Sequence, residues 1–142
     1  MGKVNRGRGY AAIVAGTIDG APIGSTTPAA VNSVKTVVTH SASENVTAIS
    51  MYGSEHIVIG AYTETLPAAV VGMWAPFRAT TAAVMTLDCQ AADSFILGGT
   101  TLTAGNKIAT DGSLGVEFEV ICLVANRWTV RNITGTVIDG GA

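Results

Sequence analysis

Hydrophobic and polar positions are most clearly patterned in the last third of the chain. Residues 116–124 read Val-Glu-Phe-Glu-Val-Ile-Cys-Leu-Val, and residues 127–138 form a second run rich in β-branched side chains. Short apolar runs enriched in β-branched and aromatic residues are typical of strands. Only Ala125 and Asn126 separate the two runs. The pattern therefore predicts a β-hairpin around which the rest of the chain packs.

Similar short runs occur earlier in the chain. Residues 34–40 predict a strand, and residues 46–52 and 56–62 predict two more on either side of a Gly-Ser turn. Turn signals recur about every ten residues, and no window shows an apolar stripe at helical spacing. We therefore predict an all-β fold, a compact antiparallel β-sandwich or barrel with an extended N-terminal arm. Pro76 lies inside the run 70–80 and predicts an edge strand or a bulge there.

The first third of the chain differs in character. Residues 1–10 contain three basic residues, three glycines and no acidic residue, a composition that cannot bury a core of its own. We expect a flexible arm at 1–10, an extended strand and connector at 11–33, and a β domain at 34–142. The arm is either a frayed terminus or a segment that orders on a neighbouring subunit or an acidic surface.

Composition points to an interface. The 142 residues suit one domain, with 48% hydrophobic and only 13% charged residues and a mean hydropathy of +0.42. A typical globular domain has about 25% charged residues, so we expect part of the surface to be covered by a partner. No apolar run approaches the roughly 18 residues of a membrane helix, and no signal peptide is expected. The net charge of −2 gives no support to nucleic-acid binding.

Candidate chemistry is sparse. His40 and His56 are the only histidines; on separate predicted strands they suggest satisfied or solvent-facing side chains, because a metal site needs further ligands nearby. Glu117 and Glu119 share one face of a strand. We interpret this as the solvent-facing side of an amphipathic strand rather than a catalytic pair, and an arginine of the return strand can neutralise one of the two carboxylates. We expect no enzymatic activity, no cofactor and no metal site.

The glycine-rich and cysteine-containing positions add no site. The segment Gly98-Gly99 to Lys107 lacks the Gly-Lys-Ser/Thr ending of a phosphate loop. Cys89 and Cys122 lie in separate predicted strands, and we interpret them as small buried hydrophobic residues rather than as a disulfide.

Two segments carry a resemblance to a known class of proteins. Residues 16–30, Gly-Thr-Ile-Asp-Gly-Ala-Pro-Ile-Gly-Ser-Thr-Thr-Pro-Ala-Ala, resemble a segment common in fibre and other virion structural proteins of tailed bacteriophages. Residues 65–99 and 106–130 are similar to the β modules of phage capsid decoration (cement) proteins, in which a Leu-Pro-Ala-Pro-like start leads to an Asn-x-Trp-x-Val-like hairpin. Here that start is Leu66-Pro67-Ala68-Ala69, with alanine at the second proline, and the hairpin motif is Asn126-Arg127-Trp128-Thr129-Val130.

The resemblance implies a non-enzymatic homotrimer on the outer surface of the phage head, made in the host cytoplasm. It would bridge major capsid protein subunits and stabilise the assembled shell. Candidate contacts with the capsid are Lys3, Arg6, Arg8 and Tyr10. Candidates for packing, either in the trimer or in the core, are Trp74, Phe77 and Trp128.

Two other functions stay open at this point. The first is a head-fibre or tail-fibre module that binds host surface glycans, although the chain has no shaft repeats. The second is a small carbohydrate-active or other β-sandwich enzyme, for which no catalytic pair stands out.

Overall fold

The computed structural model describes residues 17–18, 21–22 and 36–142. The chain divides into two units, Met1–Val34 and Lys35–Ala142. In the first unit, β1 (Thr17–Ile18) pairs antiparallel with β2 (Ala21–Pro22). The second unit is the β domain. The capsid-contact candidates at positions 3, 6, 8 and 10 lie outside the described residues.

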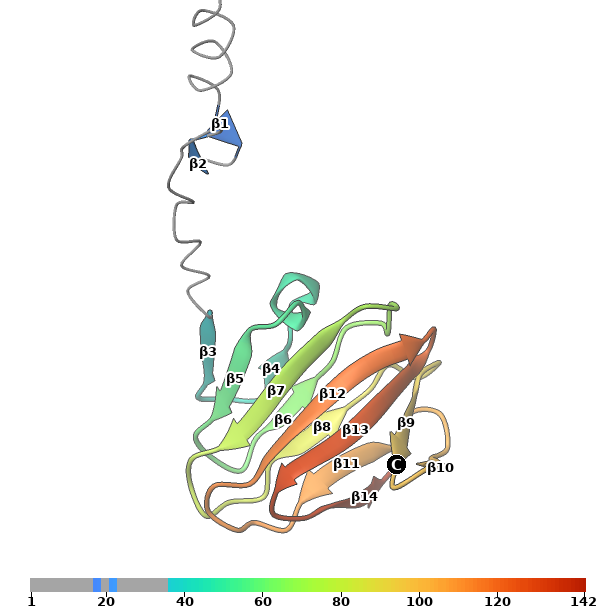
Figure 1. Cartoon of the computed structure of the whole chain (residues 1–142). Coiled ribbons are helices and arrows are strands. Elements are labelled where there is room, and N and C mark those ends of the chain that lie inside the picture. The colour runs from blue at the N-terminus through green and yellow to red at the C-terminus, as the bar shows by residue number, and fades with distance from the viewer. Residues whose placement is uncertain (1–16, 19–20, 23–35) are drawn as a thin grey trace, which may run out of the picture. The chain divides into compact units, whose positions relative to one another are not determined.

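The β domain consists of two sheets packed face to face (Figure 1). The seven-stranded sheet has the order β10-β9-β13-β12-β7-β5-β3, and the five-stranded sheet has the order β14-β11-β8-β6-β4. The strands are β3 (Val37–His40), β4 (Glu44–Asn45), β5 (Glu55–Val58), β6 (Thr63–Thr65), β7 (Trp74–Ala79), β8 (Thr86–Asp88), β9 (Ser94–Leu97), β10 (Thr100–Thr101), β11 (Lys107–Thr110), β12 (Glu117–Val124), β13 (Arg127–Thr134) and β14 (Val137–Gly141). The predicted all-β sandwich is confirmed. Among the described residues, no helix has the length and apolar character needed to span a membrane.

The part of the β domain from β3 to β8 winds in parallel. Successive strands enter alternate sheets, so that β3, β5 and β7 run parallel in one sheet and β4, β6 and β8 run parallel in the other. The sheets are therefore mixed, and the antiparallel arrangement expected throughout is wrong for this half. The physical reason is that short connections such as residues 41–43 carry the chain across to the facing sheet instead of reversing it within one sheet.

One predicted strand is absent from this winding. Residues 46–52 were expected to form a strand, but the structure has a connection there that includes the 3-10 helix η2 (Ala48–Met51). Ser50 and Met51 are the buried residues of η2. This short helix lies against β7 and brings the chain back to the seven-stranded sheet.

The second half of the domain, from β9 to β14, is built on the predicted hairpin, and we call it the antiparallel half because its strands pair antiparallel except for the parallel pair of β9 with β13. β12 and β13 pair antiparallel, and the turn places Asn126 at a φ of 62°, a conformation that asparagine tolerates better than most residues. The apolar run after the turn does not continue to residue 138 as one strand. It ends before Gly135, whose φ of 77° turns the chain into β14 of the facing sheet.

Pro76, predicted to mark an edge strand or a bulge, lies in β7 between β12 and β5, so the edge alternative is wrong. The pairing on the β5 side has the irregularity that the bulge alternative expects, because β7 advances three residues from Trp74 to Phe77 while the paired segment advances four from Tyr52 to His56. On the β12 side of β7, Met73 O accepts a hydrogen bond from Cys122 N–H, and Ala79 N–H donates to Val116 O. On the β5 side, Trp74 O accepts from Gly53 N–H, and Thr80 N–H donates to Val58 O. By this alternation the Pro76 nitrogen faces β5, where pairing is interrupted between Trp74 and Phe77. The missing N–H therefore removes no bond to β12.

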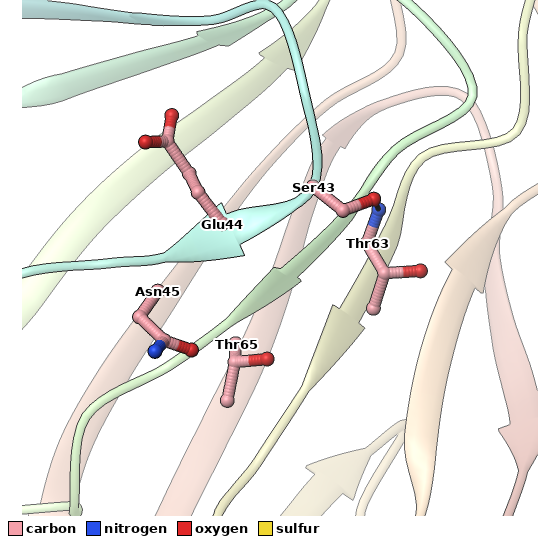
Figure 2. A pocket seen from close by; sticks show the side chains of 5 residues that line it. All are labelled: Ser43, Glu44, Asn45, Thr63 and Thr65. Atoms are coloured by element: carbon pink, nitrogen blue, oxygen red, sulfur yellow. Dashed lines mark hydrogen bonds between the residues drawn. The ribbon is translucent and has the colours of Figure 1, made fainter.

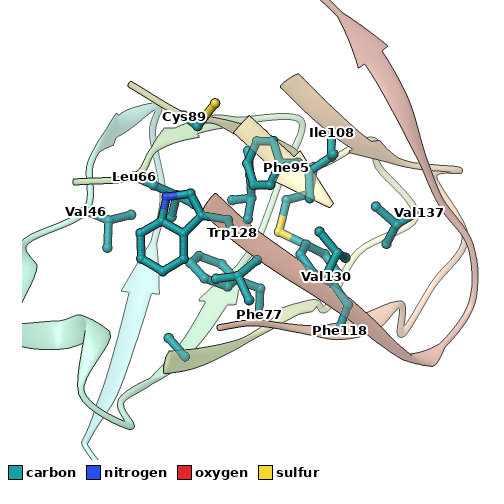
Figure 3. Packing of buried hydrophobic residues seen from close by; sticks show 14 of the residues in the cluster. Val46, Leu66, Phe77, Cys89, Phe95, Ile108, Phe118, Trp128, Val130 and Val137 are labelled. Atoms are coloured by element: carbon teal, nitrogen blue, oxygen red, sulfur yellow. The ribbon is translucent and has the colours of Figure 1, made fainter. Parts of the chain in front are cut away.

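The core fills the space between the two sheets (Figure 3). Both halves of the domain contribute to it: Phe77 comes from the parallel half, and Phe95, Phe118 and Trp128 come from the antiparallel half, all fully or almost fully buried. The rings of Phe77 and Phe118 stack with centroids 6.0 Å apart. The two halves thus share one continuous core.

Candidate functional site

A cluster of two histidines and two glutamates closes the edge of the sandwich at which the parallel winding begins. His40 lies at the end of β3 and His56 in β5, the two outermost strands of the seven-stranded sheet at this edge. Glu44 lies in β4 and Glu64 in β6, the two outermost strands of the facing sheet. We call these four residues the His–Glu cluster. It connects the two sheets at an edge where, among the described residues, neither sheet has a further strand.

Contacts within the cluster are short. Nδ1 of His40 is 2.8 Å from Oε1 of Glu44 and 3.1 Å from Oε2 of Glu64. On the other side of the ring, Nε2 of His40 is 2.7 Å from Nδ1 of His56. Nε2 of His56 in turn lies 3.3 Å from the carbonyl oxygen of Ser50. The His56 ring also stacks on Phe77, with centroids 4.6 Å apart.

Chemistry fixes where the protons of this chain lie. A carbonyl oxygen only accepts, so Nε2 of His56 carries a proton and donates it to Ser50. In neutral His56 the Nδ1 atom is then an acceptor, and Nε2 of His40 must donate to it. The remaining atom, Nδ1 of His40, faces the carboxyl groups of Glu44 and Glu64.

Electrostatics supports this assignment. Burial lowers the pKa of His56 to about 4, and the neighbouring His40 acts in the same direction. For His40, burial also lowers the pKa, but hydrogen bonding and the charges of Glu64 and Glu44 outweigh it and raise the pKa above 6.5. The ring of His56 is therefore neutral near pH 7, while a proton on Nδ1 of His40 is favoured.

Glu64 is the most unusual member of the cluster. Its side chain has no exposed surface, and neither carboxyl oxygen has a hydrogen-bond partner among the described residues. The 3.1 Å contact with Nδ1 of His40 lacks hydrogen-bond geometry, because that nitrogen is directed at Glu44. A buried carboxylate is costly without compensation, so this side chain needs a cation close by.

A polar hollow of about 300 Å³ lies on the β4 and β6 strands (Figure 2). The Oγ of Ser43 accepts a hydrogen bond from the backbone N–H of Thr63 at 2.9 Å. Asn45 and Thr65 lie side by side in register, and Figure 2 shows Glu44 pointing away from them. Because side chains alternate along a strand, Glu44 and its register partner Glu64 share the opposite face.

Exposed apolar side chains gather at one end of the sandwich. The N–H of Gly72 donates to Cys122 O, and the N–H of Asn126 donates to Ala69 O, so the β6–β7 connection runs along the β12–β13 turn. The segment before β5 joins them through the bridge between Tyr52 and Trp74. We call this surface the apolar end, and its exposed members are Ile49, Tyr52, Val70, Val71, Leu123 and Val124.

The predicted packing residues divide between core and surface. Phe77 and Trp128 are fully buried in the core, whereas Trp74 is only half-buried, beside Tyr52 of the apolar end. Both cysteines are buried and free, so their interpretation as small buried residues is confirmed. Glu119 lies 3.5 Å from Arg131 of the return strand, as the hairpin predicts, and Glu117 lies 2.8 Å from Arg78.

The His–Glu cluster was missed in the sequence. The two histidines were treated as unrelated, but the parallel winding places Nε2 of His40 2.7 Å from Nδ1 of His56. The signal that reveals it is the repetition of a short strand carrying histidine (Val-Val-Thr-His, then Glu-His-Ile-Val), each followed by a strand carrying glutamate.

Comparison with known proteins does not assign the site. The chain matches no family model, no curated protein sequence and no solved structure. Arguments about function therefore rest on the residues and the geometry described above.

Proposed function

We propose that this chain is a non-enzymatic capsid decoration protein of a tailed bacteriophage. It attaches to the outer surface of the assembled head, bridges major capsid protein subunits and acts as a homotrimer. The observation that carries the proposal is the apolar end, together with the sequence resemblance described above. Large apolar side chains exposed together mark surfaces that bind another protein.

The composition of the apolar end supports a protein partner. The three segments that form it, residues 46–54, 66–74 and 121–126, contain no charged side chain. Exposed fractions include 79% for Ile49 and 61% for Leu123. Depletion of charge with enrichment in aromatic and aliphatic side chains is typical of the buried centre of a protein interface.

The apolar end also includes the start of the first strand of the β domain. β3 runs parallel to β5 and β7, and β7 begins at the apolar end with Trp74. β3 therefore begins at that same end.

Binding to heads tests the proposal directly. The full chain is mixed with expanded heads assembled from the major capsid protein of its own phage, and bound protein is measured by cosedimentation. We expect saturable binding that the double variant Val71→Ser/Leu123→Ser weakens at least tenfold. Leu114→Ser is the matched control, because Leu114 is 70% exposed in the connection before β12, at the opposite end of that strand.

The outcomes separate the parts of the proposal. Absence of binding by the wild-type chain would overturn the decoration function. Equal binding by the double variant would show that another surface docks. Light scattering of the unmixed chain tests the trimer, which predicts three times the 14.4 kDa of one chain.

A second candidate, glycan binding by a fibre module, is favoured by one observation. The hollow on β4 and β6 presents hydroxyl and amide groups from Ser43, Asn45, Thr63 and Thr65, which are suited to hydrogen-bonding sugar hydroxyls. A glycan array probed with the full chain tests it. A specific hit that Asn45→Ala abolishes would favour this function over decoration.

A further inference from the structure

The structure assigns a divalent metal site, of the type that binds Zn²⁺, to Nδ1 of His40 and the carboxylates of Glu44 and Glu64. The ion would join the edge of one sheet to the edge of the other. This site is independent of the proposed capsid function.

The ligand atoms have the spacing of a coordination shell. One atom from each of His40, Glu44 and Glu64 lies within 4.8 Å of the others, and Nδ1 of His40 is 2.8 and 3.1 Å from its two carboxyl neighbours. Zinc–nitrogen and zinc–oxygen bonds of about 2.0–2.2 Å place neighbouring ligand atoms about 3.3 Å apart in a tetrahedral shell. To admit the ion, Nδ1 of His40 would move about half an ångström or less from its carboxyl neighbours, and the two carboxylates, within 4.8 Å of each other, would approach by at most about 1.5 Å.

The hydrogen-bond chain behind His40 prepares its ring for a metal. Nε2 of His40 donates to Nδ1 of His56 at 2.7 Å, and His56 donates onward to Ser50 O. A metal-binding histidine almost always donates its other ring N–H to a second group, which fixes the ring and its tautomer. A metal ion would displace the proton from Nδ1 of His40, and the lone pair freed in this way would be directed toward the two glutamates.

The independent observation is the buried carboxyl group of Glu64, whose oxygens accept no hydrogen bond from the described residues. It has no exposed surface and no hydrogen bond among the described residues, yet it is directed at His40. A second carboxylate, from Glu44, faces the same nitrogen. Two carboxylates beside one imidazole repel each other unless positive charge lies among them. A proton on Nδ1 of His40 compensates one of the two negative charges, whereas a divalent ion in its place compensates both.

The ligand set favours zinc over magnesium or calcium. Imidazole nitrogen is a preferred ligand of zinc and its first-row neighbours, whereas magnesium and calcium prefer oxygen alone. Access is provided by Glu44, whose side chain is 49% exposed on the outermost strand of its sheet. Water would complete the four ligands on that side.

Calorimetric titration tests the site. The full chain is freed of metal with a chelator, dialysed and titrated with ZnCl₂ near pH 7. We expect one ion per chain and a rise in Tm on binding. MgCl₂ at the same concentration should leave Tm unchanged. Equal stabilisation by Mg²⁺, or no saturable binding of Zn²⁺, would overturn the proposal.

Two variants and one control locate the ion. Glu64→Gln and Glu44→Gln should each weaken Zn²⁺ binding at least tenfold. Glu119→Gln, which removes one carboxylate elsewhere, should bind as the wild type does. Because Glu44 is half exposed, its variant is expected to fold, so unchanged binding by Glu44→Gln would contradict the site even if Glu64→Gln fails to fold.

Cobalt(II) provides a readout of the ligand type. Co²⁺ bound to one imidazole and two carboxylates gives weak d–d absorption without a thiolate charge-transfer band. A strong charge-transfer band would place the ion at Cys89 or Cys122 and overturn the assignment. Loss of the d–d bands in Glu44→Gln would support it.

Discussion

The β domain is built in two ways, and the two halves differ in which residues they bring together. From β3 to β8 the chain winds in parallel between two sheets, so that neighbours in a sheet belong to different turns of the winding. In the β12–β13 hairpin, neighbours are close in sequence and antiparallel. The winding produces the His–Glu cluster across the two sheets, whereas the hairpin produces one partly exposed ion pair between Glu119 and Arg131. Unusual chemistry therefore arises where the pairing is non-local.

The largest expected effect on stability comes from removing the side chain that packs the two halves against each other. Phe77 lies in β7, which pairs parallel with β5 and antiparallel with β12, and its ring stacks with both His56 and Phe118. Phe77→Ala should lower the free energy of unfolding by about 4 kcal/mol, as for other fully buried phenylalanines. Urea unfolding followed by tryptophan fluorescence measures it.

Phe77→Leu is the control for this prediction, with an expected loss of about 1–1.5 kcal/mol because most of the volume is retained. Hydrogen exchange tells whether the halves unfold together. A loss below 1 kcal/mol for the alanine variant, or protection lost in one half alone, would show that the two halves do not depend on a common core.

The next effect separates the halves by pH. In chelating buffer, unfolded histidines titrate near pH 6.5, whereas folded His56 titrates at about 4 and folded His40 above 6.5. Between pH 4 and 6.5 the unfolded chain binds more protons, so acidification should destabilise the fold, by up to about 3 kcal/mol from His56. Just above pH 6.5 the folded chain binds more protons, so stability should fall again as the pH rises through the raised pKa of His40.

Urea unfolding at a series of pH values measures this maximum near pH 6.5. His56→Leu should reduce the loss of stability at acidic pH. The variant lacks the histidine that is neutral in the folded chain and takes up a proton on unfolding. The exposed pair in the hairpin contains no histidine, so Glu119→Gln should keep the maximum. A His56→Leu profile that matches the wild type would contradict the predicted role of His56.

Gly135 offers a test of the crossing from the hairpin to the facing sheet. A Cβ added there would lie 2.7 Å from Cγ2 of Val116, at a φ of +77°. Gly99 has a similar φ of +86° but nothing within 4 Å. Both alanine variants should cost about 1 kcal/mol for the left-handed backbone, and Gly135→Ala should lose about 1–2 kcal/mol more from the clash. Equal Tm values for the two variants would contradict the close packing at this crossing.

The same difference between the halves explains what could be predicted from the sequence. The β12–β13 hairpin and the pairing of Glu119 with Arg131 followed from local alternation and a short turn. The contact between His40 and His56 could not be predicted in this way. A short strand followed by a turn has the same sequence pattern whether the chain reverses within one sheet or crosses to the facing sheet. For Pro76 the sequence left an edge strand and a bulge open for a related reason, since its position depends on which neighbouring strand its nitrogen faces.

The smallest expected effect lies in the hairpin ion pair. Arg131 has a 68% exposed side chain and approaches Glu119 only to 3.5 Å, so water and salt screen the attraction. A double-mutant cycle with Glu119→Gln and Arg131→Gln should give a coupling of about 0.5 kcal/mol or less, decreasing in 1 M salt. Glu64, in contrast, is buried without a hydrogen bond, and we expect strong coupling only for charges enclosed in this way by the parallel winding. A coupling above about 2 kcal/mol between Glu119 and Arg131 would contradict this difference, because a surface pair would then stabilise the fold as strongly as a buried one.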